Sequence, residues 1–211
     1  MLKLGEKIIK NLYLGDRAIK KAYLGDKLVY KKAGGRFVKS ILFDENSFVN
    51  TGIKHQTCTI ECRIRFEETG TRQLMGFSLS TAGYWGAGAS GTFDYLTNTN
   101  ALDMTDVVLE FNTDNTSAPT LTLYADGRSR TSTGTTVTSG NYKIGSTGDK
   151  SGDTYLYSSR CEVEYNKTTI NGELIQDLRP YVDENNVACF KDIVTGNLFY
   201  NQGTGTLGYT E

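Results

Sequence analysis

The 211-residue sequence is poor in the residues on which many functional sites depend, with one histidine, two prolines and one tryptophan. The single histidine, His55, excludes histidine-rich metal sites and leaves little basis for a Ser-His-Asp site. No stretch approaches the roughly 18 apolar residues of a membrane span, and the N-terminus lacks the apolar core of a secretory signal. Abundant Gly, Thr, Ser and Tyr with few strong helix formers favour an all-β chain.

A large net charge is also absent, because the whole chain carries only −1. This figure hides a division along the sequence. Residues 1–39 hold eleven lysines and arginines against three acids, a net charge of +8, whereas the other residues hold twelve basic and twenty-one acidic side chains, a net charge of −9. Such asymmetry indicates a basic segment followed by an acidic domain.

The cysteines are few, and the one close pair has a C-x3-C spacing, which does not match a zinc knuckle. Two of them alternate with polar residues in 57–66, a pattern that predicts a strand with both thiols on its apolar face. A third lies in a similar alternation with Val163 and Tyr165. We expect reduced core thiols rather than a metal site or disulfides, which agrees with assembly in a reducing cytoplasm. The four residues are Cys58, Cys62, Cys161 and Cys189.

The N-terminal segment repeats a ten-residue unit three times, with copies beginning at Leu4, Leu14 and Leu24. Each copy opens with Leu-Gly, an acid and a base, and the first two copies close with Tyr. Gly followed by an acid favours a tight turn, so the unit predicts short strands joined by turns in a β-meander of about 30 residues.

A meander of this size buries little apolar surface by itself, so the neighbouring domain, other copies of the chain or a separate protein must cover it. We expect residues 1–35 to be a basic docking or oligomerisation segment that meets an acidic surface, either foreign or on a sandwich domain of this chain. The alternative is a small extra sheet with lysines protecting its edges. Nucleic acid is not expected as a partner, because the lysines do not cluster with exposed aromatics. The residues assigned to docking are Leu4, Ile9, Tyr13, Leu14, Ile19, Lys20, Lys21, Tyr23, Leu24, Val29 and Tyr30.

From residue 36 to residue 211, after a Gly34-Gly35 linker, short alternating segments and turn signals predict an antiparallel β-sandwich or barrel. Asp126-Gly127 is a strong hairpin signal. Residues 171–178 have a weak helical pattern that Gly172 interrupts. The expected strands are 37–43, 47–50, 57–67, 73–79, 84–89, 92–95, 106–111, 120–125, 128–132, 141–145, 155–165, 187–190 and 197–200.

Four segments carry a resemblance to a known fold: residues 42–53, 155–163, 177–183 and 187–205. The last contains a run of the form D-x-x-T-G-x-F-x-x-N-x-G-T-G. Together they resemble the concanavalin A-like, laminin G-like jelly-roll domains of phage and bacterial surface proteins, which implies a jelly-roll sandwich. The chain departs from that family at residues 189–190, where Cys and Phe replace Gly and Leu-Tyr.

The N-terminal repeats are similar to segments common at the start of tailed-phage structural proteins. With the sandwich, they imply a non-enzymatic bacteriophage virion protein, a head or tail decoration, fibre or adaptor. The expected partners are other virion proteins and copies of itself, a homotrimer in the simplest case, after assembly in the host cytoplasm. No cofactor or metal is expected.

An active site is not expected on this sandwich. Glycosidases need two carboxylates, about 5–5.5 Å apart when retaining and about 6.5–9.5 Å apart when inverting. Glucanases of the resembling superfamily carry Glu-x-Asp-x-Glu on one strand, whereas here Glu162 and Glu164 lack a central partner and Asn166 stands in the third position. A glycan-acting enzyme or accessory domain remains the alternative, as does an architectural protein without a ligand.

Weak glycan binding is the expected activity of the sandwich, because sugar sites stack a ring on an aromatic face and orient it with polar groups. Many copies on one particle would multiply a weak affinity. The alternative is that the aromatic pair at 84–85 supplies ordinary core. Asp149 and Asp153 lie in a loop where relatives bind Ca²⁺, but two acids without a third favour an ordinary loop. The glycan candidates are Tyr84, Trp85, Asp94, Tyr95 and Asn98.

Overall fold

The computed structural model describes residues 34–211 except 45, 67–72, 79–83, 89–102, 126, 134–139 and 146–159, together with short strands before residue 34. For those early strands and for 73–78 and 84–88, it describes the backbone. Every regular element in these residues is a β-strand and none is a helix, which confirms the all-β prediction. A membrane-crossing helix is not found in the part of the chain that the structure describes.

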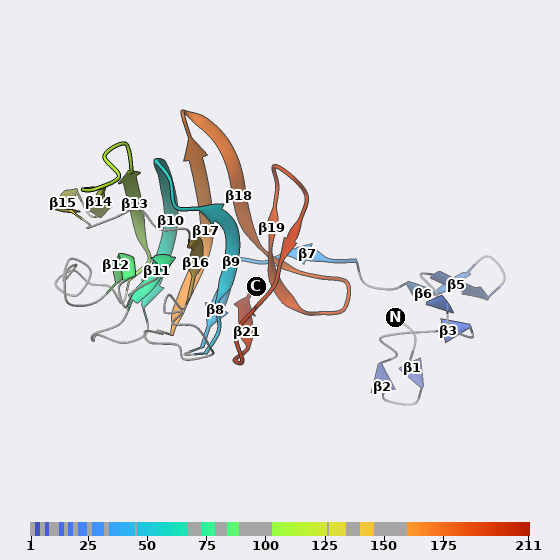
Figure 1. Ribbon diagram of the computed structural model, residues 1–211. Helices are drawn as coiled ribbons and strands as arrows, with labels where there is room; N and C mark the ends of the chain where they lie inside the picture. The colour runs from blue at the N-terminus through green and yellow to red at the C-terminus, as the bar shows by residue number, and fades with distance from the viewer. Residues whose placement is uncertain are drawn as a thin grey trace.

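The larger of the two antiparallel sheets that follow the N-terminal strands has eleven strands, and β17 lies at its centre (Figure 1). One side of β17 pairs with β10 along its length, while β8 and β18 share the other side. The order runs β15-β14-β13-β10-β17-β18-β19-β20, with β7 on β18 and β21 on β8. The strands are β7 (Arg36–Phe37), β8 (Ser40–Phe43), β10 (Cys58–Phe66), β13 (Thr105–Asn112), β14 (Thr120–Ala125), β15 (Arg128–Thr133), β17 (Cys161–Ile170), β18 (Glu173–Val182), β19 (Ala188–Asp192), β20 (Leu198–Phe199) and β21 (Leu207–Thr210).

The smaller sheet has four strands in the order β12-β11-β16-β9. Figure 1 shows it in front of β13, β10 and β17, so that the two sheets form the layers of a sandwich. Its strands are β9 (Val49–Lys54), β11 (Gln73–Ser78), β12 (Tyr84–Gly88) and β16 (Asn141–Ile144).

The core lies between the layers and follows from the alternation of apolar and polar residues. Along β13, buried and more exposed residues alternate without interruption, as expected for a strand with one face on a core. Ile60 of β10 and Leu109 of β13 are fully buried, and Val49, Tyr142 and Ile144 of the smaller sheet belong to the same cluster. The predicted sandwich is therefore confirmed at the level of its two layers.

None of the four cysteines forms a disulfide and all four are buried, as expected for core thiols. Burial raises the pKa of Cys58 and of Cys189 to about 12, and it raises the pKa of Cys62 still further. Their thiols are packed as small hydrophobic groups rather than exposed as nucleophiles.

A β-bulge changes the faces of the central strand. Ile64 of β10 pairs with Val163, whereas the preceding Arg63 pairs with Tyr165, so Glu164 is an extra residue on β17. An extra residue shifts the alternation by one position. The prediction that Tyr165 shares the face of Cys161 is therefore wrong: Tyr165 hydrogen bonds to Asp106 on the exposed side of the sheet.

Several predicted boundaries need correction. The expected strand 37–43 is divided into β7 and β8, and residues 173–182 form β18 where the sequence had only a weak helical pattern. The expected strand 155–165 becomes β17, which begins at Cys161 and continues to Ile170, while β21 was not predicted. The predicted strand 92–95 lies outside the described residues.

Candidate functional site

The three N-terminal repeats form three β-hairpins with the same register. Leu4 pairs with Lys7, Leu14 with Arg17 and Leu24 with Lys27, so Gly and an acid separate the paired residues in every copy. The pairing of the strands on either side of each Leu-Gly-acid-base unit therefore agrees with the predicted hairpins. The strands are β1 (Lys3–Leu4), β2 (Lys7–Ile8), β3 (Tyr13–Leu14), β4 (Arg17–Ala18), β5 (Lys21–Leu24) and β6 (Lys27–Lys31).

The hairpins are three separate two-stranded sheets rather than one continuous meander, and none joins either sheet of the sandwich. Figure 1 shows β1 to β6 beyond β7, outside both layers. An isolated two-stranded hairpin is at best marginally stable in water. Most residues assigned to docking lie on these strands, whereas Ile9, Ile19 and Lys20 lie outside the described residues.

The glycan candidates are described only in part. Tyr84 and Trp85 lie on β12, the end strand of the smaller sheet, while Asp94, Tyr95 and Asn98 are outside the described residues. Trp85 pairs with Phe77, and Phe77 pairs on its other side with Tyr142, a fully buried residue. Paired positions share a face, so this register puts position 85 on the inner face and position 84 on the outer face.

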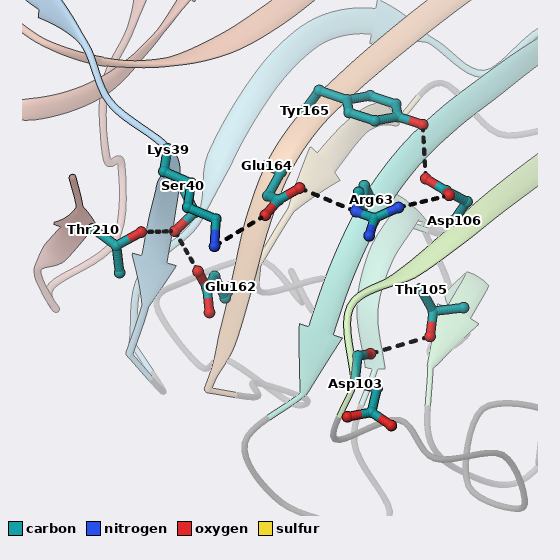
Figure 2. Close-up of polar contacts among 10 residues, drawn as sticks. All are labelled: Lys39, Ser40, Arg63, Asp103, Thr105, Asp106, Glu162, Glu164, Tyr165 and Thr210. Atoms are coloured by element: carbon teal, nitrogen blue, oxygen red, sulfur yellow. Dashed lines mark hydrogen bonds and ion pairs between the residues drawn. The ribbon is translucent and has the colours of Figure 1, made fainter.

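A network of polar side chains covers the outer face of the larger sheet (Figure 2). The guanidinium of Arg63 contacts two acids, with 2.8 Å to Asp106 and 3.0 Å to Glu164. Lys39 lies 3.8 Å from the other oxygen of Glu164, and the Tyr165 hydroxyl donates to Asp106 at 3.0 Å. The sequence signal for this network was the run of charged residues in β10 and β17, but the bulge that adds Tyr165 to it was missed.

Glu162 is the most buried acid of the network, with its side chain 5% exposed. Its two oxygens accept hydrogen bonds from Ser40 and from Arg65, each at 2.5 Å. Ser40 also contacts the Thr210 hydroxyl, so this acid connects β10 and β17 with β8 and the C-terminal strand β21. Glu162 and Glu164, the two acids considered for a glycosidase site, therefore both contact other side chains of the sheet. Each would have to leave these partners to contact a substrate.

The closing run of the sequence is an arrangement of hydrogen bonds around Asn201. Its side-chain oxygen accepts from the N–H groups of Phe48 and Gly203, and its amide donates to the carbonyls of Gly203 and Gly205. Gly205 is required because a Cβ there would overlap the Asp44 carboxylate. The motif that carried the resemblance therefore fastens the C-terminal run to the loop between β8 and β9.

Asp44 and Asp192 also hold the loops of this region in place by accepting hydrogen bonds. Burial raises the pKa of Asp44, but hydrogen bonds from the N–H groups of Thr206 and Asn46 outweigh it and leave that pKa below its ordinary value. Asp192 accepts from the N–H groups of Asp177 and Val194 and from the Thr195 hydroxyl. These acids stabilise loops, and their oxygens are already occupied by protein donors.

Within the described residues, no group of three or more His, Cys, Asp or Glu side chains is arranged to hold a metal ion. Asp149 and Asp153 lie outside those residues. A scan against protein-family models finds no match to the chain, and a search of curated proteins finds no match either.

Proposed function

We propose that the chain is a non-enzymatic structural protein of a bacteriophage virion, which docks through its N-terminal hairpins and displays the β-sandwich. The observation that carries this proposal is the set of three hairpins with one register, each a two-stranded sheet of its own. Hairpins of this kind need another surface to cover their apolar side chains.

The charge of the hairpin segment supports a protein surface as that cover. Residues 1–39 contain eleven basic and three acidic residues, so this segment is attracted to acidic surfaces. One such surface is the rest of another copy, residues 40–211, which carries a net charge of −9. Three copies that interlace their hairpins around a threefold axis would cover each other, which is the homotrimer we propose. The resemblance of the repeats to tailed-phage proteins supports a virion location, with assembly in the host cytoplasm and other virion proteins as partners.

The sandwich is proposed to bind glycans weakly along the end strand β12. Supporting this choice, Tyr84 is on the outer face by register and lies at the edge of the smaller sheet. An aromatic ring at such a position offers a face for a sugar to stack on. A glycan array with the full chain tests this: binding that is lost in Tyr84→Ala supports it, and an array without binding favours a purely architectural protein.

Docking is tested by assembly of the full chain into particles. We expect the variant with Leu4→Ser, Leu14→Ser and Leu24→Ser to be lost from purified particles, because the hairpins lose the apolar residue beside each turn. Leu174→Ser is the matched control, since Leu174 is an exposed leucine of the sandwich, and it should be incorporated normally. Normal incorporation of the triple variant would contradict the proposal. Capsid, portal or tail genes beside the gene for this chain would support virion membership.

The alternative function, a glycan-acting enzyme or an accessory carbohydrate-binding domain, has its own test. Turnover of a polysaccharide panel by the full chain, abolished in Glu162→Gln or Glu164→Gln, would overturn the non-enzymatic proposal. Absence of turnover by the unaltered chain is the result we expect.

A further inference from the structure

The core of the sandwich contains a cluster of uncharged polar side chains. Asn166 and Thr168 of β17 are fully buried, and Gln176 of β18 is 5% exposed. Asn166 pairs with the core residue Leu178, and Thr168 pairs with Gln176, so all three lie on the inner face of the larger sheet. Buried positions of this kind are normally apolar, and a polar group there needs hydrogen-bond partners.

Two of these side chains reach across to the smaller sheet. The amide nitrogen of Asn166 donates to the Tyr142 hydroxyl at 2.9 Å, and that of Gln176 donates to the Thr51 carbonyl at 3.0 Å. These bonds fix the orientation of both amides, because each donor group is directed at an atom of the opposite layer.

Three oxygens of the cluster have no hydrogen-bond partner among the residues that the structure describes: Oδ1 of Asn166, Oγ1 of Thr168 and Oε1 of Gln176. The three residues that carry these oxygens are neighbours in the sheet, because directly paired residues have Cα atoms about 5 Å apart and residues i and i+2 of a strand about 7 Å apart. The pairing of β17 with β18 also shifts just after Thr168, a bulge that interrupts the regular ladder at this point.

We propose that these three oxygens bind one internal water molecule between the layers. The two amide oxygens can only accept hydrogen bonds, while the Thr168 hydroxyl can donate. A water molecule has two O–H groups for the two acceptors and a lone pair for the hydroxyl proton, and buried waters typically make about three hydrogen bonds. A cation does not fit, because none of these three side chains carries the charge that a buried ion needs. The site is independent of the proposed docking function.

A crystal structure of the full chain at a resolution that shows ordered water tests the proposal directly. We expect a water oxygen within about 2.7–3.2 Å of all three side-chain oxygens. A direct hydrogen bond from Thr168 to Asn166 or Gln176, with no water between the layers, would overturn the proposal.

Oxygen-17 relaxation dispersion, which counts water molecules held inside a protein in solution, gives a second readout. Thr168→Ile replaces the hydroxyl with an ethyl group that occupies the place of the water, so the count should fall by one. The matched control is Thr169→Ile, because Thr169 is partly exposed and pairs with Leu174 rather than with a residue of the cluster. An equal number of internal water molecules in the unaltered chain and in Thr168→Ile would contradict the proposed water site. If Thr168→Ile does not fold, the crystal structure of the unaltered chain decides.

Discussion

The N-terminal hairpins and the sandwich use the same residue types but cover them differently. In the sandwich, β10 and β17 each have paired neighbours on both sides, and the second sheet covers their inner face. In the hairpins, each strand has one partner and its sheet ends there. The comparison shows that the ten-residue repeats form separate two-stranded sheets and that, in the described residues, none of these joins a sheet of the sandwich.

The two regions also differ in how charges are neutralised. On the sandwich, Arg63 contacts both Asp106 and Glu164, and Arg65 contacts Glu162, so cations and acids pair on one sheet. Residues 1–39 have too few acids for such pairing, with eleven cations against three. The segment therefore keeps an excess of positive charge, which favours attraction to an acidic surface.

This contrast between the two regions predicts that the largest loss of stability follows substitution of an aromatic residue in the sandwich core. Phe190 is fully buried and stacks on Phe43 at a centroid distance of 6.1 Å. Phe190→Ala should lower the free energy of unfolding by about 4 kcal/mol, because it leaves a cavity in the core. Phe37→Ala is the control, since Phe37 is 56% exposed in β7 beside the hairpins, and it should cost less than about 1 kcal/mol in urea unfolding. Similar losses in both variants would mean that the sandwich core extends to the hairpin side.

The next largest loss of stability is expected when the hydrogen bonds that attach the C-terminal run to the loop between β8 and β9 are removed. Asn201→Ala removes four hydrogen bonds and should lower the free energy of unfolding by about 2–3 kcal/mol. Asn197→Ala, at an exposed position of the turn before β20, should cost less than about 0.5 kcal/mol. Equal midpoints in chemical denaturation would refute the role assigned to Asn201.

A smaller effect is expected from the outer network. Glu162→Gln should cost about 2 kcal/mol, because it removes the charge of a buried carboxylate that accepts hydrogen bonds from Ser40 and Arg65. Glu164→Gln should cost less than about 1 kcal/mol, since the side chain of Glu164 is 21% exposed and its partners Arg63 and Lys39 are on the surface. Thermal unfolding of both variants measures this difference in stability. A larger loss in Glu164→Gln than in Glu162→Gln would contradict the prediction.

The smallest effect is a dependence of stability on pH. Burial lowers the pKa of His55 below its ordinary value of 6.5, so the unfolded chain binds this proton more readily than the folded chain. The contribution of a neutral His55 is complete above pH 6.5 and is lost as the pH falls through 6.5 toward the folded pKa. Because the chain has one histidine, His55→Gln should flatten the pH dependence of unfolding as the pH falls through 6.5, and an unchanged slope would count against it.

The sequence was sufficient for the elements whose signal is local. The alternation around Ile60 predicted β10 and its buried cysteines, and Asp126-Gly127 predicted the hairpin in which Ala125 pairs with Arg128. The repeats predicted the three N-terminal strand pairs for the same reason, since a hairpin turn depends on a few adjacent residues.

The rest depended on contacts between distant residues. The bulge at Glu164 is set by the pairing of β17 with β10 and β8, which no local pattern reveals. The partner of Glu162 is Ser40, 122 residues away, and the polar cluster at Asn166 and Gln176 is visible only when two strands and a second layer meet. The closing run was recognised by resemblance, but its role required the loop that Asn201 fastens.

Sedimentation equilibrium of the full chain is the most direct test of the central claim that the hairpins, and not the sandwich, join this protein to its neighbours. We predict that the unaltered chain self-associates and that the Leu4→Ser, Leu14→Ser, Leu24→Ser variant has the mass of one chain, with an unchanged melting temperature of the sandwich. An unchanged mass in the triple variant, or a sandwich that melts with the loss of the leucines, would contradict the account.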